Sequence, residues 1–420
     1  MNFITSRMNN IQAIDKYAAR ALMAGFFLPM ALQAIMITAV CIYFTCRVVA
    51  GKRPVAINNI LWALALGSGF LLYLGAVPLT SVADRPELMM LIGRRASSLL
   101  MPVAFAVIMP SFGALIIKEL KFFVYACIII CVAANAAFLC QHYFAGIAPS
   151  PLSHVAYRQY LEHFTGLHPT YLSMYIAFAI CILLCGWVNC GKAIKFAILY
   201  SLVLFLFAIL AKSPLIAFII ITAHFCYYRR SHLLKYSGWV SIMALALAGG
   251  CFFIPFIGQR VGELFVFGAK QNQTVDANNS IFIRKLIWGT DINMLKHYWL
   301  TGMGPARLTR LLDYRYFFYS IEHTISIGYY DPHNEYLWEW LSFGVAGIGI
   351  SVGVLLIHLT KAFKTRNHLY LYLLIILCVT FFTESVLSRQ QGILFYVVFT
   401  SAMFFYKPGA GRSMPSKANL

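Results

Sequence analysis

The segment FAILYSLVLFLFAILAKSPLIAFIIITAHF, from Phe196 to Phe225, carries one charged residue over a length sufficient for nearly two membrane spans. A helix that crosses the hydrocarbon core of a bilayer needs about 20 predominantly apolar residues. The apolar runs 194–211 and 213–228 approach that length, and only Lys212 separates them. This pattern predicts two adjacent transmembrane helices joined by a very tight turn that carries a positive charge.

The same pattern recurs along the whole chain of 420 residues. Hydrophobic residues make up 61% of the sequence and charged residues only 11%, whereas soluble domains carry about 25% charge. The composition excludes a soluble globular protein and predicts an all-α, polytopic membrane bundle. Eleven apolar runs reach or approach spanning length: 21–46, 60–80, 98–117, 122–143, 170–188, 194–211, 213–228, 236–256, 336–358, 369–387 and 391–406.

The first apolar run, 21–46, is long for one helix and contains Pro29 about a third of the way along. Proline breaks or kinks a helix, so two short segments are an alternative to one span. Two segments give about 12 transmembrane helices with both chain ends in the cytoplasm. The polar opening lacks the apolar core and cleavage site of a signal peptide, so we expect the first run to stay as an anchor.

The net charge of +19 resides to a large extent in short connections between the apolar runs. Positive charge is concentrated in the cytoplasmic loops of membrane proteins and attracts anionic lipid there. The charge therefore indicates topology and contact with membrane lipid, and it argues against a nucleic-acid partner. The basic residues cluster in alternate loops, at 47–53, 118–121, 192–195, 229–235, 361–366 and 407–417.

Alternation of these loops places residues 257–334 outside the cytoplasm. The stretch is too polar to span a membrane and too long for a simple turn. It divides the chain into an N-terminal transmembrane bundle (1–256), a large extracytoplasmic loop (257–334), and C-terminal transmembrane helices with a cytoplasmic tail (335–420). Within the loop, the helical spacing of apolar residues in NSIFIRKLIWGTDINMLKHYWL (279–300) predicts an amphipathic helix near the membrane face, closed by the turn TGMGP.

The loop ends in DPHNEYLWEW, which places His333, Asn334 and Glu335 at a membrane boundary. Histidine has an unperturbed pKa near 6.5, so it is largely neutral at pH 7 and can accept a proton. The alternative is a histidine that is simply satisfied within the core. Glu335 is a candidate for orienting the ring, although a residue two positions along a helix points in another direction.

Two cations lie where positive charge is costly or unexpected. A lysine at the centre of a spanning helix costs about 2.5–3.5 kcal/mol on insertion scales. Lys212 therefore either reaches to the interface from its tight turn or lines an anion site that opens to the outside. Arg284 lies on the predicted loop helix one turn before Trp288, and it faces either solvent or the cavity at the membrane.

Four further residues have mainly structural interpretations. Arg389 follows Glu384 by five residues in a short outer connection, where an ion pair would join two helices. Arg94 and Arg95 are interpreted as interfacial anchors, and His168 is expected to cap the helix that follows it.

The chain lacks the common signatures of metal or nucleotide chemistry. It contains no DxD, HExxH or Walker-type glycine loop. Asp84 and Glu87 are the only candidates for paired carboxylates on the outer side, and they form a weak alternative metal site. The eleven cysteines show no CxxC spacing and indicate buried thiols without disulfides. We expect neither a metal nor a cofactor.

Several of these segments together resemble bacterial O-antigen ligases and the related O-antigen polymerase superfamily of polytopic glycosyltransferases. The resemblance is carried by AKSPLIAF, by IRKLIWGTDINMLKHYWLTGMGP and by DPHNEYLWEWLSFGVAGI, and HPTYLS and ESVLSRQQG are also similar to motifs of the superfamily. The order and spacing of the segments, the large late loop and the number of spans agree over most of the chain.

The resemblance implies a GT-C-like bundle in the bacterial inner membrane with an active site facing the periplasm. It implies an inverting, metal-independent transfer of a glycan from undecaprenyl pyrophosphate to a hydroxyl of lipid A–core oligosaccharide, which completes lipopolysaccharide. By the same resemblance, His333 is the general base. Arg284 and Lys212 hold the donor pyrophosphate, although the family often has arginine at the position of Lys212. Supporting roles are expected for Glu335, Asn334, Arg389 and His168.

Three other functions remain open on the sequence. An O-antigen or exopolysaccharide polymerase would use another lipid-linked repeat unit as acceptor, and a protein O-oligosaccharyltransferase would use serine or threonine. A membrane transporter belongs to a different class and should show matched breaks in the spans of two halves. The sequence shows no such pairing.

Overall fold

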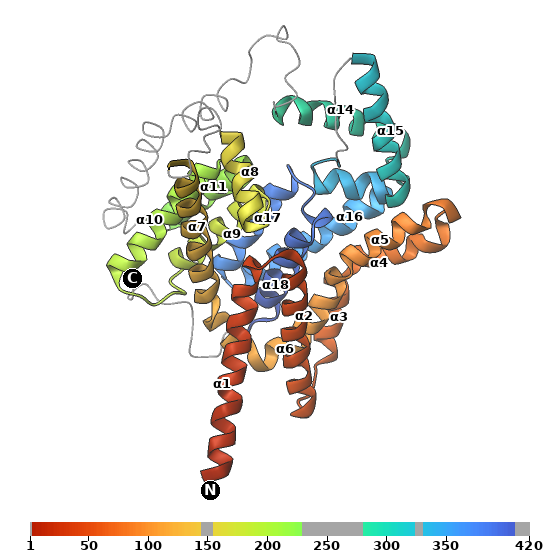
Figure 1. The fold of residues 1–420 in the computed structure, drawn as a ribbon. Helices are drawn as coiled ribbons and strands as arrows, with labels where there is room; N and C mark the ends of the chain where they lie inside the picture. Colours follow the sequence, from red (N-terminus) through yellow and green to blue (C-terminus); the bar gives the residue numbers. More distant parts are fainter. Residues whose placement is uncertain (1, 144–153, 229–279, 324–330, 408–420) are drawn as a thin grey trace.

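The computed structural model describes residues 2–143, 154–228, 280–323 and 331–407. Every regular element within these ranges is a helix, which confirms the predicted all-α class (Figure 1). The predicted span at 236–256 and the first part of the predicted loop, 257–279, lie outside the described residues.

The helices before the large loop make up most of the bundle. They are α1 (Asn2–Ala24), α2 (Met30–Ala50), α3 (Ile57–Leu66), α4 (Ser68–Ala76), α5 (Arg85–Arg95), α6 (Ser97–Lys118), α7 (Leu120–Tyr143), α8 (His154–Thr165), α9 (Pro169–Leu184), α10 (Lys192–Ile209) and α11 (Lys212–Tyr228). The later part of the chain contributes α14 (Ser280–Tyr298), α15 (Pro305–His323), α16 (Glu335–Lys364), α17 (His368–Phe381) and α18 (Gln390–Phe405). Short 3-10 helices lie at Gly25–Phe27 (η1), Val77–Leu79 (η2), Val82–Asp84 (η3) and Val386–Ser388 (η5).

The first apolar run is broken before Pro29, as the two-segment alternative predicts. Helix α1 ends at Ala24, and Pro29 occupies the N-terminal cap of α2. Proline has no N–H to donate, so the break leaves carbonyl groups without their usual partners. The buried Gln33 side chain donates to the carbonyl of Phe26 at 3.2 Å and satisfies one of them. Two helices therefore replace one long span.

The centre of the bundle is formed by α9 and α18, in which almost every residue is buried. Their aromatic side chains meet at edge-to-face and stacked distances: Tyr175 stacks on Phe395 with ring centroids 4.9 Å apart, and Phe178 meets Phe399 at 4.8 Å. Such pairs add stability beyond the area that they bury. The surrounding helices, including α6, α7, α10, α11 and α17, pack around this centre (Figure 1).

The length and composition of the described helices bear on the predicted count of about twelve spans. Within the described residues, five helices are long and apolar enough to cross a membrane, and the count reaches seven if each of two bent pairs forms one span. The pairs are α3 with α4, which bend by 62°, and α8 with α9, which bend by 76°. Helices α11, α17 and α18 are apolar but shorter. The multi-pass character is confirmed, whereas the count of about 12 is not.

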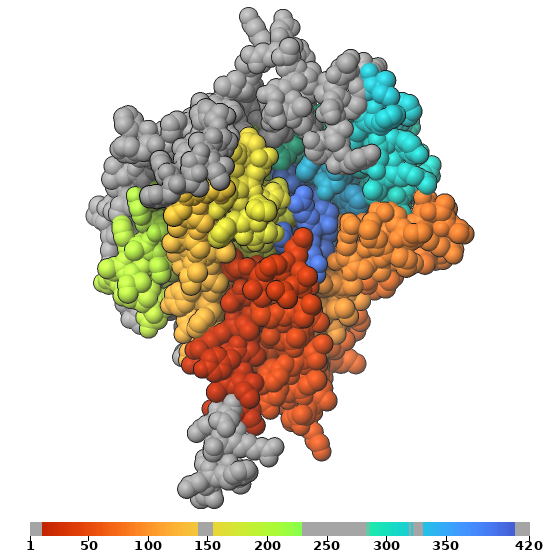
Figure 2. All heavy atoms as spheres, viewed as in Figure 1, coloured from red at the N-terminus to blue at the C-terminus, as the bar shows by residue number. Residues whose placement is uncertain are grey.

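Helices α4 and α5 extend to one side of the bundle, and α5 packs against α15 (Figures 1 and 2). An ion pair between Arg310 Nη1 and Asp84 Oδ1, 2.8 Å apart, joins α15 to the turn before α5. Beneath this lobe, α5 ends at Arg95, whose side chain reaches the start of α16. The lobe therefore holds the first turn of α16 from the side opposite to α17.

Helix α16 is interrupted at Gly344, which has a φ of +63°. The turn after α14 packs into this interruption: Met303 N donates to Leu341 O at 2.9 Å, and Val345 N donates to Leu300 O at 3.1 Å. These bonds satisfy backbone groups that the break in α16 would otherwise leave without partners. The predicted TGMGP turn is confirmed, and it fixes the end of α14 directly to α16.

Candidate active site

His333 lies in the short loop that leads into α16 and has a φ of +44°. This left-handed conformation costs a non-glycine residue about 1–2 kcal/mol, so the surroundings must hold it. The backbone N–H of His333 donates to Asp331 Oδ1 at 2.9 Å. The side chain of Asn334 caps α16 by accepting from Leu337 N at 3.1 Å. Such strain is concentrated at functional sites.

Glu384 brings His333 and Arg284 together. Its Oε2 lies 3.1 Å from His333 Nδ1, and its Oε1 accepts from Arg284 Nη2 at 2.7 Å. The three side chains come from the loop before α16, from α14 and from the connection between α17 and α18. A second contact supports the arrangement, because Trp288 Nε1 on α14 donates to the carbonyl of Pro332 at 3.1 Å.

The contact with Glu384 determines how the ring of His333 can act. A carboxylate accepts hydrogen bonds, so Nδ1 carries the proton and donates it to Glu384. The lone pair of the neutral ring is then on Nε2, which is the atom that can take a proton from another group. Burial lowers the pKa of His333, but the hydrogen bond to Glu384 and the charges of Glu384 and Asp331 outweigh burial, so the pKa is raised above 6.5.

Glu384 remains an anion across the whole neutral range. Burial alone would raise its pKa, but the hydrogen bond with His333 and the positive charge of Arg284 lower it to about 2. A carboxylate that is ionised and fixed beside Nδ1 stabilises the imidazolium that forms when Nε2 accepts a proton. The pair can thus act as a general base with an orienting carboxylate.

Arg284 retains hydrogen-bonding capacity beyond its contact with Glu384. A guanidinium has five N–H donors, and within the described part of the chain the buried Nε of Arg284 has no hydrogen-bond partner. The side chain is 24% exposed. Its charge lies close enough to His333 to act on the ring. An anion bound here would therefore lie beside the imidazole.

Lys212 lies at the same edge of the bundle. Helix α10 ends at Ile209, Leu210 adopts a left-handed φ of +49°, and α11 begins at Lys212, which confirms the predicted tight turn. The hydroxyl of Ser213 is hydrogen-bonded to that of Thr383, the residue before Glu384. The half-buried Lys212 is therefore one residue from a contact with the segment that carries Glu384.

Comparison with known proteins finds a family match that covers part of this site. Residues 196–352 match the family model described as O-antigen ligase. These residues are similar to the O-antigen ligase family. The match confirms the resemblance noted in the sequence, and the matched segment includes Lys212, Arg284 and His333. A search of curated proteins found no match.

Glu384 lies C-terminal to the residues that match the O-antigen ligase model. The sequence predicted that Glu384 pairs with Arg389, and this prediction is wrong. Arg389 does not pair with Glu384; its Nη1 lies 3.9 Å from Glu162 Oε1 on α8, and both side chains are about half exposed. Glu384 instead contacts His333 and Arg284 because it lies in the turn after α17 that faces the loop before α16. The sequence indicated an ion-paired acid here but not its partners.

Two other predictions near His333 need correction. Glu335 does not orient the ring of His333; its carboxylate binds Arg95 and the backbone N–H of Leu387. Arg95 is buried and is not an interfacial anchor, whereas Arg94 is exposed and contacts Met90. An acid in the first turn of a buried helix requires a cation, and Arg95 supplies it.

His168 has the capping position predicted for it, because its Nδ1 accepts from Thr170 N at 3.4 Å. It is also close enough to Glu384 to lower the pKa of that carboxyl. Asp84, half of the alternative metal site, is paired with Arg310. Across the described ranges, no group of three or more histidine, cysteine, aspartate and glutamate side chains is arranged to hold a metal ion.

One buried acid escaped the sequence analysis. Asp291 lies on the same face of α14 as Arg284 and Trp288, at spacings of seven and three residues. It is fully buried, and neither carboxylate oxygen has a hydrogen-bond partner among the described residues. Burial, assisted by the charge of Asp331, raises its pKa to about 8, so the group is mostly protonated at neutral pH.

Proposed function

We propose that this protein transfers a glycan from undecaprenyl pyrophosphate to a hydroxyl of lipid A–core oligosaccharide at the periplasmic face of the bacterial inner membrane. The reaction inverts the anomeric centre and requires no metal. The proposal builds on the O-antigen ligase match, which covers residues 196–352, and on the several helices long and apolar enough to cross a membrane.

The observation that carries the proposal is the bridging of His333 and Arg284 by Glu384. A base and a phosphate-binding cation are both needed in a transfer from a lipid diphosphate to an alcohol. The base must reach the acceptor hydroxyl, and the cation must reach the departing diphosphate. One carboxylate positions both groups in this fold.

The proposed reaction is a single displacement. The acceptor hydroxyl loses its proton to Nε2 of His333 as its oxygen attacks the anomeric carbon. The bond between that carbon and the diphosphate oxygen breaks, and the diphosphate leaves with the electron pair. Glu384 accepts the hydrogen bond from Nδ1 throughout, so it stabilises the imidazolium as positive charge develops. A general base of this kind contributes about 10²–10⁴-fold to a rate.

Arg284 and Lys212 take up the charge of the leaving diphosphate. Fixed cations in a poorly hydrated site stabilise such charge more than water does. Arg284 can form two parallel hydrogen bonds with a phosphate, whereas Lys212 acts as a point charge. Arg284 is therefore expected to determine how the donor is oriented, and Lys212 to add general attraction for it.

The deciding experiment is reconstitution of the purified protein in lipid with a lipid-linked glycan donor. Lipid A–core, a second lipid-linked repeat unit and a serine-containing peptide are offered separately, and His333→Ala serves as the inactive control. We expect glycan on lipid A–core alone, and the rate should persist in EDTA. Product on the repeat unit or on the peptide would instead identify a polymerase or a protein transferase. Loss in EDTA with recovery in Mg²⁺ would contradict the metal-independent mechanism.

A further inference from the structure

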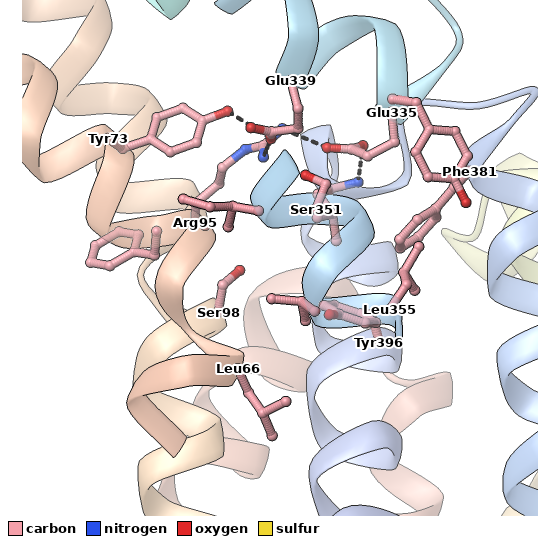
Figure 3. Close-up of a pocket in the computed structure, with 16 residues that line it drawn as sticks. Leu66, Tyr73, Arg95, Ser98, Glu335, Glu339, Ser351, Leu355, Phe381 and Tyr396 are labelled. Atoms are coloured by element: carbon pink, nitrogen blue, oxygen red, sulfur yellow. Dashed lines mark hydrogen bonds and ion pairs between the residues drawn. The ribbon is translucent and has the colours of Figure 1, made fainter. Parts of the chain in front are cut away.

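A buried charge cluster borders a pocket at the start of α16, the helix that follows His333 (Figure 3). Glu335 and Glu339, one turn apart on α16, both bind the guanidinium of Arg95 from the end of α5. Arg95 Nη2 donates to Glu335 Oε1 at 2.9 Å, and Arg95 Nη1 donates to Glu339 Oε1. All three side chains are at most 5% exposed. Charges buried this deeply require good geometry to persist.

Aromatic side chains complete the surroundings of Arg95. Its guanidinium lies 4.8 Å from the ring centre of Tyr73, within the range of a cation–π contact. The hydroxyl of Tyr73 donates to Glu339 Oε1 at 3.1 Å and accepts from Trp338 Nε1 at 2.9 Å. Arg95 is thus held from several sides, so it provides a rigid anchor for the first turn of α16.

The two glutamates differ in their second oxygen. Glu335 Oε2 accepts from the backbone N–H of Leu387 at 2.8 Å. Glu339 Oε2 is buried and has no hydrogen-bond partner within the described ranges. Glu339 also borders a cavity of about 60 Å³ that is otherwise lined mainly by apolar side chains. The two acids thus share one cation, but only Glu335 contacts the connection between α17 and α18.

The position of the Glu335 contact relates it to the active site. Glu335 follows His333 by two residues, and Leu387 follows Glu384 by three. One buried carboxylate therefore joins the segment that carries the base to the segment that carries its orienting acid. A more exposed bond, from Ser388 Oγ to Asp331 Oδ2 at 3.2 Å, joins the same two segments.

We propose that Glu335, anchored by Arg95, is a positioning residue that holds Glu384 against Nδ1 of His333. Glu335 touches neither substrate nor ring. It acts by fixing the distance between two backbone segments, and Arg95 holds its carboxylate in place. The proposal rests on the proposed function in one respect, namely that His333 is the base whose orientation matters.

Glutamine substitutions at the two positions separate positioning from charge. Glu335→Gln keeps the length of the side chain but offers one acceptor oxygen to two donors, the Arg95 guanidinium and the Leu387 N–H. Glu339→Gln keeps an acceptor for Arg95 and Tyr73, and it places its amide nitrogen where no described bond exists. Both variants remove one negative charge beside Arg95, so Glu339→Gln is the matched control.

The first measurement reports on His333 without any substrate. Diethyl pyrocarbonate modifies neutral imidazole, and peptide mass spectrometry follows the modification of His333 as a function of pH in the full-length protein. If Glu335 holds Glu384 in place, the midpoint falls in Glu335→Gln and in Glu384→Gln and stays constant in Glu339→Gln. An unchanged midpoint in Glu335→Gln, combined with a lower one in Glu384→Gln, would overturn the proposal.

The second measurement is the rate of the proposed transfer. Misplacement of a catalytic group by about 1 Å can cost about 10²-fold, so Glu335→Gln should lower kcat by about 10- to 100-fold with KM for the donor little changed. Equal losses in Glu335→Gln and Glu339→Gln would mean that charge alone matters and would overturn the proposal. If Glu335→Gln does not fold, Glu335→Asp is measured in its place; it keeps the charge but shortens the reach, so it should show the same shifts.

A shifted His333 midpoint without transfer activity in the wild-type protein would separate the two claims. In that case the positioning contact stands and the proposed function fails. Transfer activity with an unchanged midpoint in Glu335→Gln gives the reverse result, because the function stands and the positioning contact fails.

Discussion

The acid–base behaviour of His333 depends on neighbours of opposite charge. Glu384 and Asp331 raise its pKa, while burial and the positive charge of Arg284 lower it. The ring is therefore sensitive to a change in any one of these groups. The free base is needed to accept a proton, so the proposed transfer should accelerate as the pH rises through the pKa of His333.

Replacing Glu384 by glutamine should move the rising part of the pH–rate profile to lower pH. The substitution removes both the strong hydrogen bond to Nδ1 and the negative charge, and each of these raises the pKa of His333. Burial and the charge of Arg284, which lower that pKa, remain in place, so the pKa of His333 should fall. The maximal rate should fall by at least about tenfold, because the imidazolium loses its stabilising carboxylate. Initial rates measured from pH 5 to 9 check both effects. A profile displaced to higher pH would contradict this account.

Replacing Arg284 by alanine should move the same part of the profile in the opposite direction. The positive charge of Arg284 lowers the pKa of His333, so its removal raises that pKa and requires a higher pH for the free base. KM for the donor should also increase by about tenfold or more, equivalent to about 1.4 kcal/mol of binding. Arg284→Lys is the control, because it keeps the charge and should restore the profile but only part of the donor affinity.

At the level of elements, the break in α16 is an obligatory feature. The backbone at Gly344 has a positive φ, and a side chain there would overlap the carbonyl of Leu300. Gly302 meets the same constraint from the other side, because a side chain at Gly302 would press on the backbone of residues 342–344. The two glycines permit the turn after α14 to enter α16.

Gly344→Ala should therefore destabilise the protein by more than about 2 kcal/mol, from the left-handed backbone and from the overlap together. The control is Gly349→Ala on the same helix, where nothing lies within 4 Å of an added methyl group; there alanine should be neutral or stabilising by up to about 1 kcal/mol. Thermal unfolding in detergent, followed by tryptophan fluorescence, compares the two. Equal melting temperatures would show that the turn does not depend on Gly344.

The elements themselves follow largely from hydrophobic periodicity and punctuation. Pro29 and the TGMGP turn were placed correctly because proline and glycine restrict the backbone locally. The bends at Gly67 and between α8 and α9 were not foreseen, since an apolar run has the same composition whether it is straight or bent. The predicted count of spans therefore took no account of these bends.

The contacts of the site depend on tertiary structure that local sequence does not encode. His333, Arg284 and Lys212 were singled out because a charge or a histidine beside an apolar run is unusual. The partners Glu384 and Arg95 were seen as residues but assigned wrongly, because Glu384 lies 51 positions from His333 and Arg95 lies 240 positions from Glu335. Only the packing of α5 and α17 on α16 brings them together.

For the molecule as a whole, the predicted orientation can be read from two native cysteines. Cys46 and Cys140 are both exposed. The predicted topology places them on opposite sides of the membrane, Cys46 on the cytoplasmic side and Cys140 on the periplasmic side. A membrane-impermeant maleimide applied to intact spheroplasts should label Cys140 and leave Cys46 unlabelled until the membrane is opened. Peptide mass spectrometry distinguishes the two, and labelling of Cys46 alone in intact cells would invert the orientation.

The junction in which residues 300–304 enter α16 has a consequence for building hybrid proteins. The acceptor preference of the proposed transfer is a natural target for grafting a foreign segment between α14 and α16 onto this scaffold. A graft that starts after α14 and stops before α16 would separate Met303 from Leu341 and Leu300 from Val345. The foreign segment should therefore be exchanged together with the first half of α16, so that the turn after α14 and the break in α16 come from the same parent protein.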